Sequence, residues 1–235
     1  MAGLSVSAVE DGVVRVELDR PPENLFTVEL CRELTALLTT PPEGAHVVRL
    51  SAVGETFCMG RERGGSGAGE LRAEAQVLVE VMRAMRRTRL VTVAQVQGDA
   101  AGFGAGIVAA SDVAVAVSGA RFSFPEVGIG LAPAVVLAWL PRLVGRREAF
   151  WLTATGEPLA ADRAKELGML NGVVESVEQL RSDVDARVAA LRARSPRVHS
   201  DIREMLRVFD SVGSEDALDA SIDRLVVGSL RRGDG

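Results

Sequence analysis

Hydrophobic and polar residues follow two different periods in the first part of the chain. Residues 13–18 read VVRVEL, an alternation typical of a half-buried strand. Together with residues 4–9, across a turn at 11–12 (Asp-Gly), they predict a β-hairpin. Residues 28–38 instead carry apolar side chains at helical spacing, and they follow Thr27, a favoured N-cap residue. A helix is therefore predicted directly after the hairpin.

The same alternation of strands and helices continues toward the middle of the chain. Short apolar, β-branched runs predict buried strands, and a longer amphipathic run predicts a helix. From Pro133 onward nearly every segment has helical character. The expected strands are 46–52, 90–96, 113–117 and a short extended piece at 172–175, and the expected helices include 71–87, a glycine-opened helix ending at 110, and 215–231. We expect an α/β fold whose second half is mainly helical.

Composition places the chain among ordinary folded proteins. Of its 235 residues 47% are apolar and 25% are charged, so a large buried core is expected. The net charge of −5 argues against nucleic acid or an anionic membrane as partner. The longest uncharged stretch, residues 127–141, is too short to span a bilayer. With no secretory signal and only Cys31 and Cys58, a reducing, cytoplasmic location is the expectation.

No metal site is expected from the sequence. The two histidines, His46 and His199, lie in distant segments, and no Cys/His cluster has the spacing of metal ligands.

Glycines gather where a buried strand runs into a helix, within residues 91–107. This arrangement places free backbone N–H groups and the positive end of a helix at one point, where negative charge can be stabilised. Glycines could equally serve only to let the helix pack closely on the sheet. A dinucleotide fingerprint is only partly present, because Gly102 and Gly104 fit it but Ile107 replaces its third glycine.

A single acid, Glu126, follows Pro125 in an apolar segment. A carboxylic acid in such a setting can serve as a general acid or base, although an exposed glutamate in a turn is the commoner case. A third segment, residues 54–65 (GETFCMGRERG), follows a predicted strand and on its own would be a surface loop.

In this order and spacing the segments resemble the enoyl-CoA hydratase/isomerase (crotonase) family. The resemblance covers roughly residues 5 to 230. The matching segments are 57–62 (FCMGRE), 97–106 (QGDAAGFGAG), 111–116 (SDVAVA), 120–131 (ARFSFPEVGIGL), 140–145 (LPRLVG) and 153–170 (TATGEPLAADRAKELGML).

The resemblance implies a fold and a ligand. The fold is a spiral of ββα units, here residues 1–190, with a C-terminal helical trimerisation region, here residues 191–235. Family members form homotrimers or hexamers and bind acyl-CoA thioesters. They need no separate cofactor, since CoA is part of the substrate.

The resemblance also assigns roles to residues. The backbone N–H groups of Arg61 and Phe103 match the oxyanion hole that holds the thioester oxygen, and Gly104 follows at the start of the helix. Backbone around Met59, Arg61 and Arg63 matches the binding site for the adenine end of CoA. Either arginine could contact CoA phosphates, or both could be solvated.

One departure from the family pattern bears on the reaction. Family hydratases use two glutamates, of which one matches Glu126 and the other falls at Gly106. A single acid suffices to move a proton between carbons, so double-bond isomerisation is favoured. Hydration with Glu62 or Asp99 as substitute acid, a biosynthetic decarboxylation of CoA or carrier-protein thioesters, and a non-catalytic member remain alternatives.

A second departure lies in the family's Pro-Gly-x-Gly-Gly stretch, which here reads PAVVLA from Pro133. The bulk at Val135, Val136 and Trp139 either narrows the acyl pocket or belongs to the core, and we favour the core.

Overall fold

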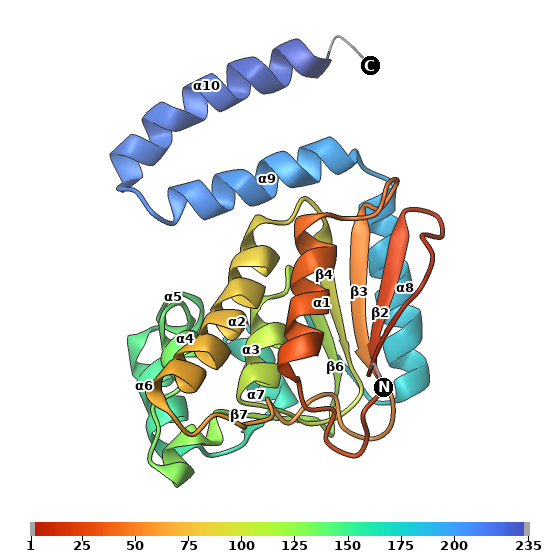
Figure 1. Cartoon of the computed structure of the whole chain (residues 1–235). Helices are drawn as coiled ribbons and strands as arrows, with labels where there is room; N and C mark the ends of the chain where they lie inside the picture. The colour runs from red at the N-terminus through yellow and green to blue at the C-terminus, as the bar shows by residue number, and fades with distance from the viewer. Residues whose placement is uncertain (1–2, 233–235) are drawn as a thin grey trace.

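A six-stranded sheet forms the centre of the computed structural model, which describes residues 3–232 (Figure 1). Its strand order is β1-β2-β3-β4-β6-β9. The outer strand β1 is antiparallel to β2, and every other neighbouring pair is parallel. The bounds are β1 Leu4–Val6, β2 Val13–Leu18, β3 Val47–Ala52, β4 Val91–Val96, β6 Val113–Val117 and β9 Gly172–Val174. The predicted hairpin is confirmed, with Asp11 and Gly12 at positive φ in its turn.

Helices cover both faces of this sheet. On one face lie α1 (Val28–Thr39), α2 (Ala68–Arg87) and α3 (Phe103–Ala110), whose apolar side chains join the main core. On the other face α8 (Val177–Arg192) packs against strands β4 and β6. The central strands are therefore buried on both sides, which explains their continuous apolar runs. The predicted N-cap is also confirmed, since the Thr27 side chain accepts a hydrogen bond from the Leu30 amide at 3.2 Å.

A second, smaller layer runs alongside the main sheet. It comprises β5 (Ala100–Ala101), β7 (Arg121–Ser123) and β8 (Leu159–Ala160). Isolated parallel bridges, Phe26 to Arg61 and Cys58 to Ala100, extend it toward the N-terminal half. Each bridging residue follows a strand of the main sheet and precedes a helix, so the chain repeats a strand, a short second strand and a helix. This is the ββα spiral that the resemblance implies.

The second half is mainly helical, as predicted. After the short 3₁₀ helix η1 (Pro125–Ile129) the chain forms α4 to α7, and α9 and α10 follow α8. Figure 1 shows α9 crossing the top of the body and α10 lying beyond it. No helix within residues 3–232 is long and apolar enough to cross a membrane. The bounds are α4 Ala134–Leu137, α5 Leu140–Val144, α6 Arg146–Thr155, α7 Ala161–Glu166, α9 Pro196–Phe209 and α10 Ser214–Arg232.

Candidate active site

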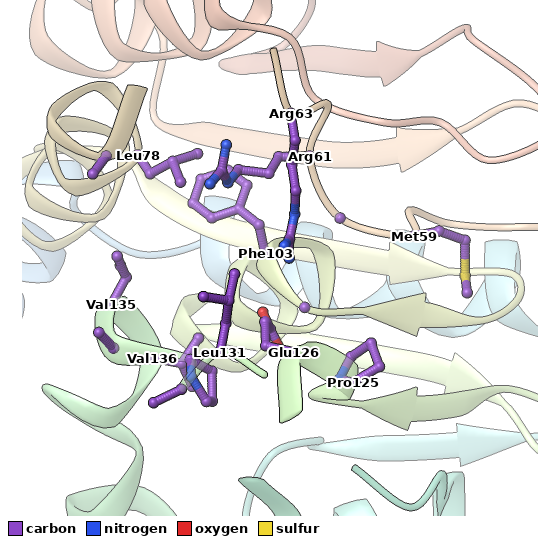
Figure 2. Close-up of a pocket in the computed structure, with 16 residues that line it drawn as sticks. Met59, Arg61, Arg63, Leu78, Phe103, Pro125, Glu126, Leu131, Val135 and Val136 are labelled. Carbon is purple, nitrogen blue, oxygen red and sulfur yellow. The ribbon is translucent and has the colours of Figure 1, made fainter. Parts of the chain in front are cut away.

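A pocket of about 290 Å³ opens where the second layer meets the start of α3. Its walls come from the loop after β3, the middle of α2, the first residue of α3, and the segment from η1 to α4. In Figure 2 the two arginines lie on one side and Pro125 and Glu126 on the opposite side, with Phe103 between them. The lining residues are Met59, Gly60, Arg61, Arg63, Ala75, Leu78, Gly102, Phe103, Pro125, Glu126, Leu131, Ala132, Pro133, Ala134, Val135 and Val136.

Two backbone N–H groups meet in this pocket. Gly60 and Glu62 pair with the backbone of Phe26 at 3.0 and 2.8 Å, whereas the N–H of Arg61 between them has no acceptor among residues 3–232. Phe103 is the first residue of α3, so its N–H has no acceptor within the helix. A Cβ on Gly60 would lie 3.9 Å from the Phe103 nitrogen, so loop and helix start are neighbours. The pair is suited to an oxygen that carries negative charge.

Two glycines allow this close approach. Gly102 has φ +51°, and a Cβ there would lie 3.0 Å from Oε1 of Glu126. A Cβ on Gly104 would lie 2.2 Å from the carbonyl oxygen of Cys58. The glycines therefore allow tight packing, and that packing brings the free N–H groups to the pocket.

Glu126 is held in η1 beside Gly102. Its side chain is half-buried, and Oε2 is buried without a hydrogen-bond partner in the described part of the chain. A buried oxygen without a partner is costly unless another molecule supplies one. Glu126 is also the one carboxylate among the residues that line the pocket. Oε2 is therefore available to hydrogen-bond a bound molecule.

The two arginines differ in their partners. The Arg61 guanidinium donates to Oε2 of Glu74 at 2.8 Å, and the backbone N–H groups of Gly64 and Gly65 donate to Oε1 of Glu74 at 3.2 and 2.6 Å. The Arg61 hydrogen bond lowers the pKa of Glu74, helped by the N–H of Gly65. Arg63 is exposed and forms no ion pair with any residue that the structure describes. Arg63 is thus the arginine available to a ligand.

A family model supplies the decisive comparison. The model for "Enoyl-CoA hydratase/isomerase" matches residues 8–221. The chain belongs to the enoyl-CoA hydratase/isomerase family. The predicted crotonase-like α/β fold is confirmed, because the crystal structure of the enoyl-CoA hydratase of Mycobacterium smegmatis superposes with a TM-score of 0.92 at 28% identity, over 97% of this chain and 91% of that one.

Two curated relatives illustrate the range of the family. A Rhodobacter capsulatus protein named "Probable enoyl-CoA hydratase" is 32% identical over 175 residues, which span 72% of this chain and 68% of that protein. The trans-2-decenoyl-[acyl-carrier-protein] isomerase of Streptococcus mutans is 27% identical over 226 residues, spanning 92% of this chain and 86% of that protein. Membership of the hydratase/isomerase family therefore leaves the reaction to be argued from the site.

Neither substitute acid lies in the pocket of this family member. Glu62 pairs with Arg20 at 2.5 Å, and Oδ1 of Asp99 accepts the backbone N–H of Arg121 at 2.8 Å. Neither lines the pocket. A Cβ on Gly106 would meet only apolar atoms within 4 Å, at 3.3 Å from Cγ2 of Val136 and 3.9 Å from Cε of Met82. The structure thus places no second carboxylate beside Glu126 within the described residues.

The preference for core at the apolar PAVVLA stretch is only partly correct. Val136 is 3% exposed and belongs to the core, yet it also lines the pocket, as does the half-buried Val135. Trp139 lines a separate cavity further along.

Sequence reasoning missed two groups. Glu74, which holds the Arg61 loop, lies on α2 without any motif to mark it. The two histidines, distant in sequence, are brought together, with Nε2 of His46 at 2.8 Å from Nδ1 of His199. Among the described residues there is still no cluster of three or more potential metal ligands.

Proposed function

We propose that this chain shifts the double bond of an enoyl thioester through an enolate. The amides of Arg61 and Phe103 bind the thioester oxygen, and the carboxylate of Glu126 removes a proton next to the double bond. The electron pair moves onto the oxygen, where the amides and the N-terminus of α3 stabilise its charge. Glu126 then returns the proton to a different carbon, which leaves the double bond shifted and the enzyme unchanged.

The single carboxylate of the pocket carries this proposal. Adding water across a double bond needs one group to activate the water and another to hold it and pass a proton. The site offers Glu126 alone, and the space beside Gly106 is bounded by Val136 and Met82. A proton transfer between two carbons of the same substrate needs no second acid, so isomerisation fits the site better than hydration.

Two other reactions use the same enolate. One is hydration, in which a second polar group of the substrate replaces the missing acid. The other is decarboxylation, in which loss of CO₂ from the substrate forms the enolate that Glu126 or water then protonates. The carrier can be CoA or a carrier protein, since the Streptococcus mutans relative is named for a carrier-protein substrate.

A product analysis separates these reactions. The protein is incubated with 3-enoyl-CoA, 2-enoyl-CoA and glutaconyl-CoA in H₂¹⁸O. The proposal expects 2-enoyl-CoA from the 3-enoyl substrate with no ¹⁸O in the acyl chain. Turnover of 2-enoyl-CoA with incorporation of ¹⁸O, and no turnover of 3-enoyl-CoA, would contradict isomerisation. Release of CO₂ from glutaconyl-CoA alone would favour decarboxylation.

Recognition of the carrier is assigned to the loop around the two arginines. The exposed guanidinium of Arg63 is suited to a phosphate of CoA, because it has no competing carboxylate in the described structure. Arg61, by contrast, already bonds Glu74. We assign phosphate binding to Arg63 and loop positioning to the side chain of Arg61.

A trimer or hexamer is part of the proposal. Leu218, Ile222 and Leu225 follow one face of α10 at helical spacing and are 61%, 60% and 70% exposed. An apolar helix face of this kind is stabilised by burial against another surface. Copies of this chain are the proposed surface.

A further inference from the structure

A second cavity lies beyond the catalytic pocket. It measures about 240 Å³ and is mainly apolar. The ion pairs of Asp210 with Arg142 at 3.1 Å and with Arg86 at 3.5 Å lie at its edge. Its lining residues are Met82, Arg86, Ala109, Ala110, Trp139, Arg142, Leu143 and Asp210.

The same three helical segments line both cavities. Along α3, Phe103 belongs to the catalytic pocket and Ala110 to the second cavity. Along α2 the corresponding residues are Leu78 and Met82, one turn apart. In α4, Val136 lines the first cavity, and Trp139, three residues later and just before α5, lines the second. The two cavities therefore lie next to one another along these segments, with Val136 and Met82 between them.

Gly106 marks the junction of the two cavities. A Cβ on Gly106 would lie 3.3 Å from Cγ2 of Val136, which lines the catalytic pocket. It would lie 3.9 Å from Cε of Met82, which lines the second cavity. Any side chain at position 106 would enter this space. Methionine has three rotatable side-chain bonds and a flexible thioether end, so Met82 can move aside at small cost.

We propose that Gly106 sets the acyl-chain specificity of the reaction proposed above. The junction is closed by the contacts of Val136 and Met82 around Gly106, and without a side chain at position 106 the acyl chain of a bound thioester enters the second cavity once the end of Met82 moves aside. Phe103, at the oxyanion position, and Ala110 are separated by about 10 Å along the helix axis. At roughly 1.2 Å per bond of an extended chain, about eight bonds cover this span. The substrates are thus thioesters whose linear acyl chains have about ten carbons or more.

Binding of saturated acyl-CoA tests this inference without turnover. Affinities are measured by titration calorimetry with butyryl-, hexanoyl-, decanoyl- and dodecanoyl-CoA. Each methylene that leaves water gains roughly fourfold in affinity at best, so the wild type is expected to bind dodecanoyl-CoA at least tenfold more tightly than butyryl-CoA. Equal affinity for the four chains would overturn the inference.

Two substitutions block the proposed path of the acyl chain at different points. Gly106→Val fills the junction, and Leu143→Trp fills the second cavity from a position that is 37% exposed and tolerant of change. Each is expected to abolish the preference for dodecanoyl-CoA while butyryl-CoA binds within about threefold of wild type. Gly119→Val is the matched control, because a Cβ at Gly119 meets nothing within 4 Å. If both variants lost affinity equally for butyryl-CoA and dodecanoyl-CoA, the proposed path of the acyl chain into the second cavity would be contradicted.

The inference rests on the proposed function, yet the two fail differently. If no acyl-CoA of any length binds, the proposed function is wrong. If acyl-CoA of every length binds equally and 3-enoyl-CoA is still isomerised, only the proposed entry of the acyl chain into the second cavity is wrong.

Discussion

Glu74 shows how a side chain outside the pocket can act on the reaction. It accepts hydrogen bonds from the Arg61 side chain and from two glycine amides of the same loop. The Arg61 backbone N–H is one of the two proposed oxyanion donors, so Glu74 is a positioning residue for that donor. A misplaced donor weakens binding of the developing charge more than binding of the ground state.

Replacing Glu74 tests this role. Glu74→Gln removes a charge-assisted hydrogen bond, and we expect kcat to fall about tenfold with a smaller change in KM. Glu70→Gln is the control, because Glu70 lies one turn earlier on α2 and accepts from the Ser66 amide at 3.0 Å without contacting Arg61. Equal kinetics for the two variants in a steady-state assay would contradict the assignment.

The hydrogen bonds of Glu74 also predict that the stability of the fold depends on pH. The Arg61 hydrogen bond and the Gly65 N–H hold the pKa of Glu74 below its usual value. The stability that Glu74 adds to the folded state is therefore fully present above its unfolded pKa of about 4.3. It is lost as the pH falls through the lower pKa of Glu74 in the folded state. In thermal melts at acidic pH the wild type should lose stability more steeply than Glu74→Gln.

Gly102 carries two constraints at once. Its φ of +51° is rarely adopted by L side chains, and its absent Cβ faces Oε1 of Glu126 at 3.0 Å. Gly102→Ala should destabilise the fold by about 1–3 kcal/mol and displace the carboxylate, so kcat should fall at least tenfold. Gly119→Ala, in open space, is the control. A Gly102→Ala variant with wild-type kcat would show that the carboxylate position is not critical.

At this scale the sequence pointed to only some of the site. Glu126, Arg61 and Phe103 came from the family resemblance, with a physical reason in the glycines and the apolar setting. Glu74 was missed because its hydrogen bonds cross from a helix to a loop. No periodicity or spacing in the chain records a contact of that kind.

At the scale of elements, long periodic segments were predicted well. The helix at α1 and the strands β3, β4 and β6 agree with the structure within about one residue. The strands β5, β7 and β8 were missed, since two or three residues are too few to show a period. These short strands form the second layer that holds the start of α3 beside the pocket. The parts of the fold most relevant to function were therefore the hardest to predict.

The histidine pair ties α9 to the sheet layer. His46 precedes β3, His199 lies in α9, and their rings stack at 5.0 Å. Burial of His46 lowers its pKa, and the charges of His199 and Arg192 lower it further. The guanidinium of Arg192 lies 3.5 Å from the carboxylate of Asp11, whose negative charge moderates the effect of Arg192 on the pKa of His46.

This pair should make stability depend on pH. Because the folded pKa of His46 is lowered, the folded state resists protonation, and its stability decreases as the pH falls below about 6.5, the unfolded value. The decrease in stability ends once the pH is below the pKa of His46 in the folded state. His199→Gln removes the second of these causes, the charge of His199, and should lessen this dependence in thermal melts between pH 5 and 8. Identical pH profiles for the variant and the wild type would show that the pair does not couple α9 to pH.

At the scale of the whole molecule, α10 is the element that a single chain leaves unexplained. It is linked to α9 by the ion pair of Arg224 with Glu204 at 2.8 Å, and Figure 1 shows it beyond the body of the molecule. The sequence predicted this helix but gave no information on which surface covers it. Contacts between copies of a chain leave no local pattern beyond the exposed apolar face.

We expect this face to hold copies of the chain together. Leu225, which is 70% exposed, is the most accessible residue of the face defined above. Leu225→Glu should shift the mass measured by sedimentation from a trimer or hexamer toward the monomer. Asp223→Lys, a charge change on the other side of α10, should leave the mass unchanged. A wild-type chain that sediments as a monomer would contradict the proposed assembly.

Proton exchange at a saturated thioester tests the central claim most directly. Decanoyl-CoA can neither isomerise nor add water, so exchange of its α-hydrogens in D₂O reports only formation of the enolate by the base. Followed by NMR, the wild-type protein should catalyse this exchange, and Glu126→Gln should bind the thioester equally well without catalysing it. Exchange that continues at the wild-type rate in Glu126→Gln would contradict the account.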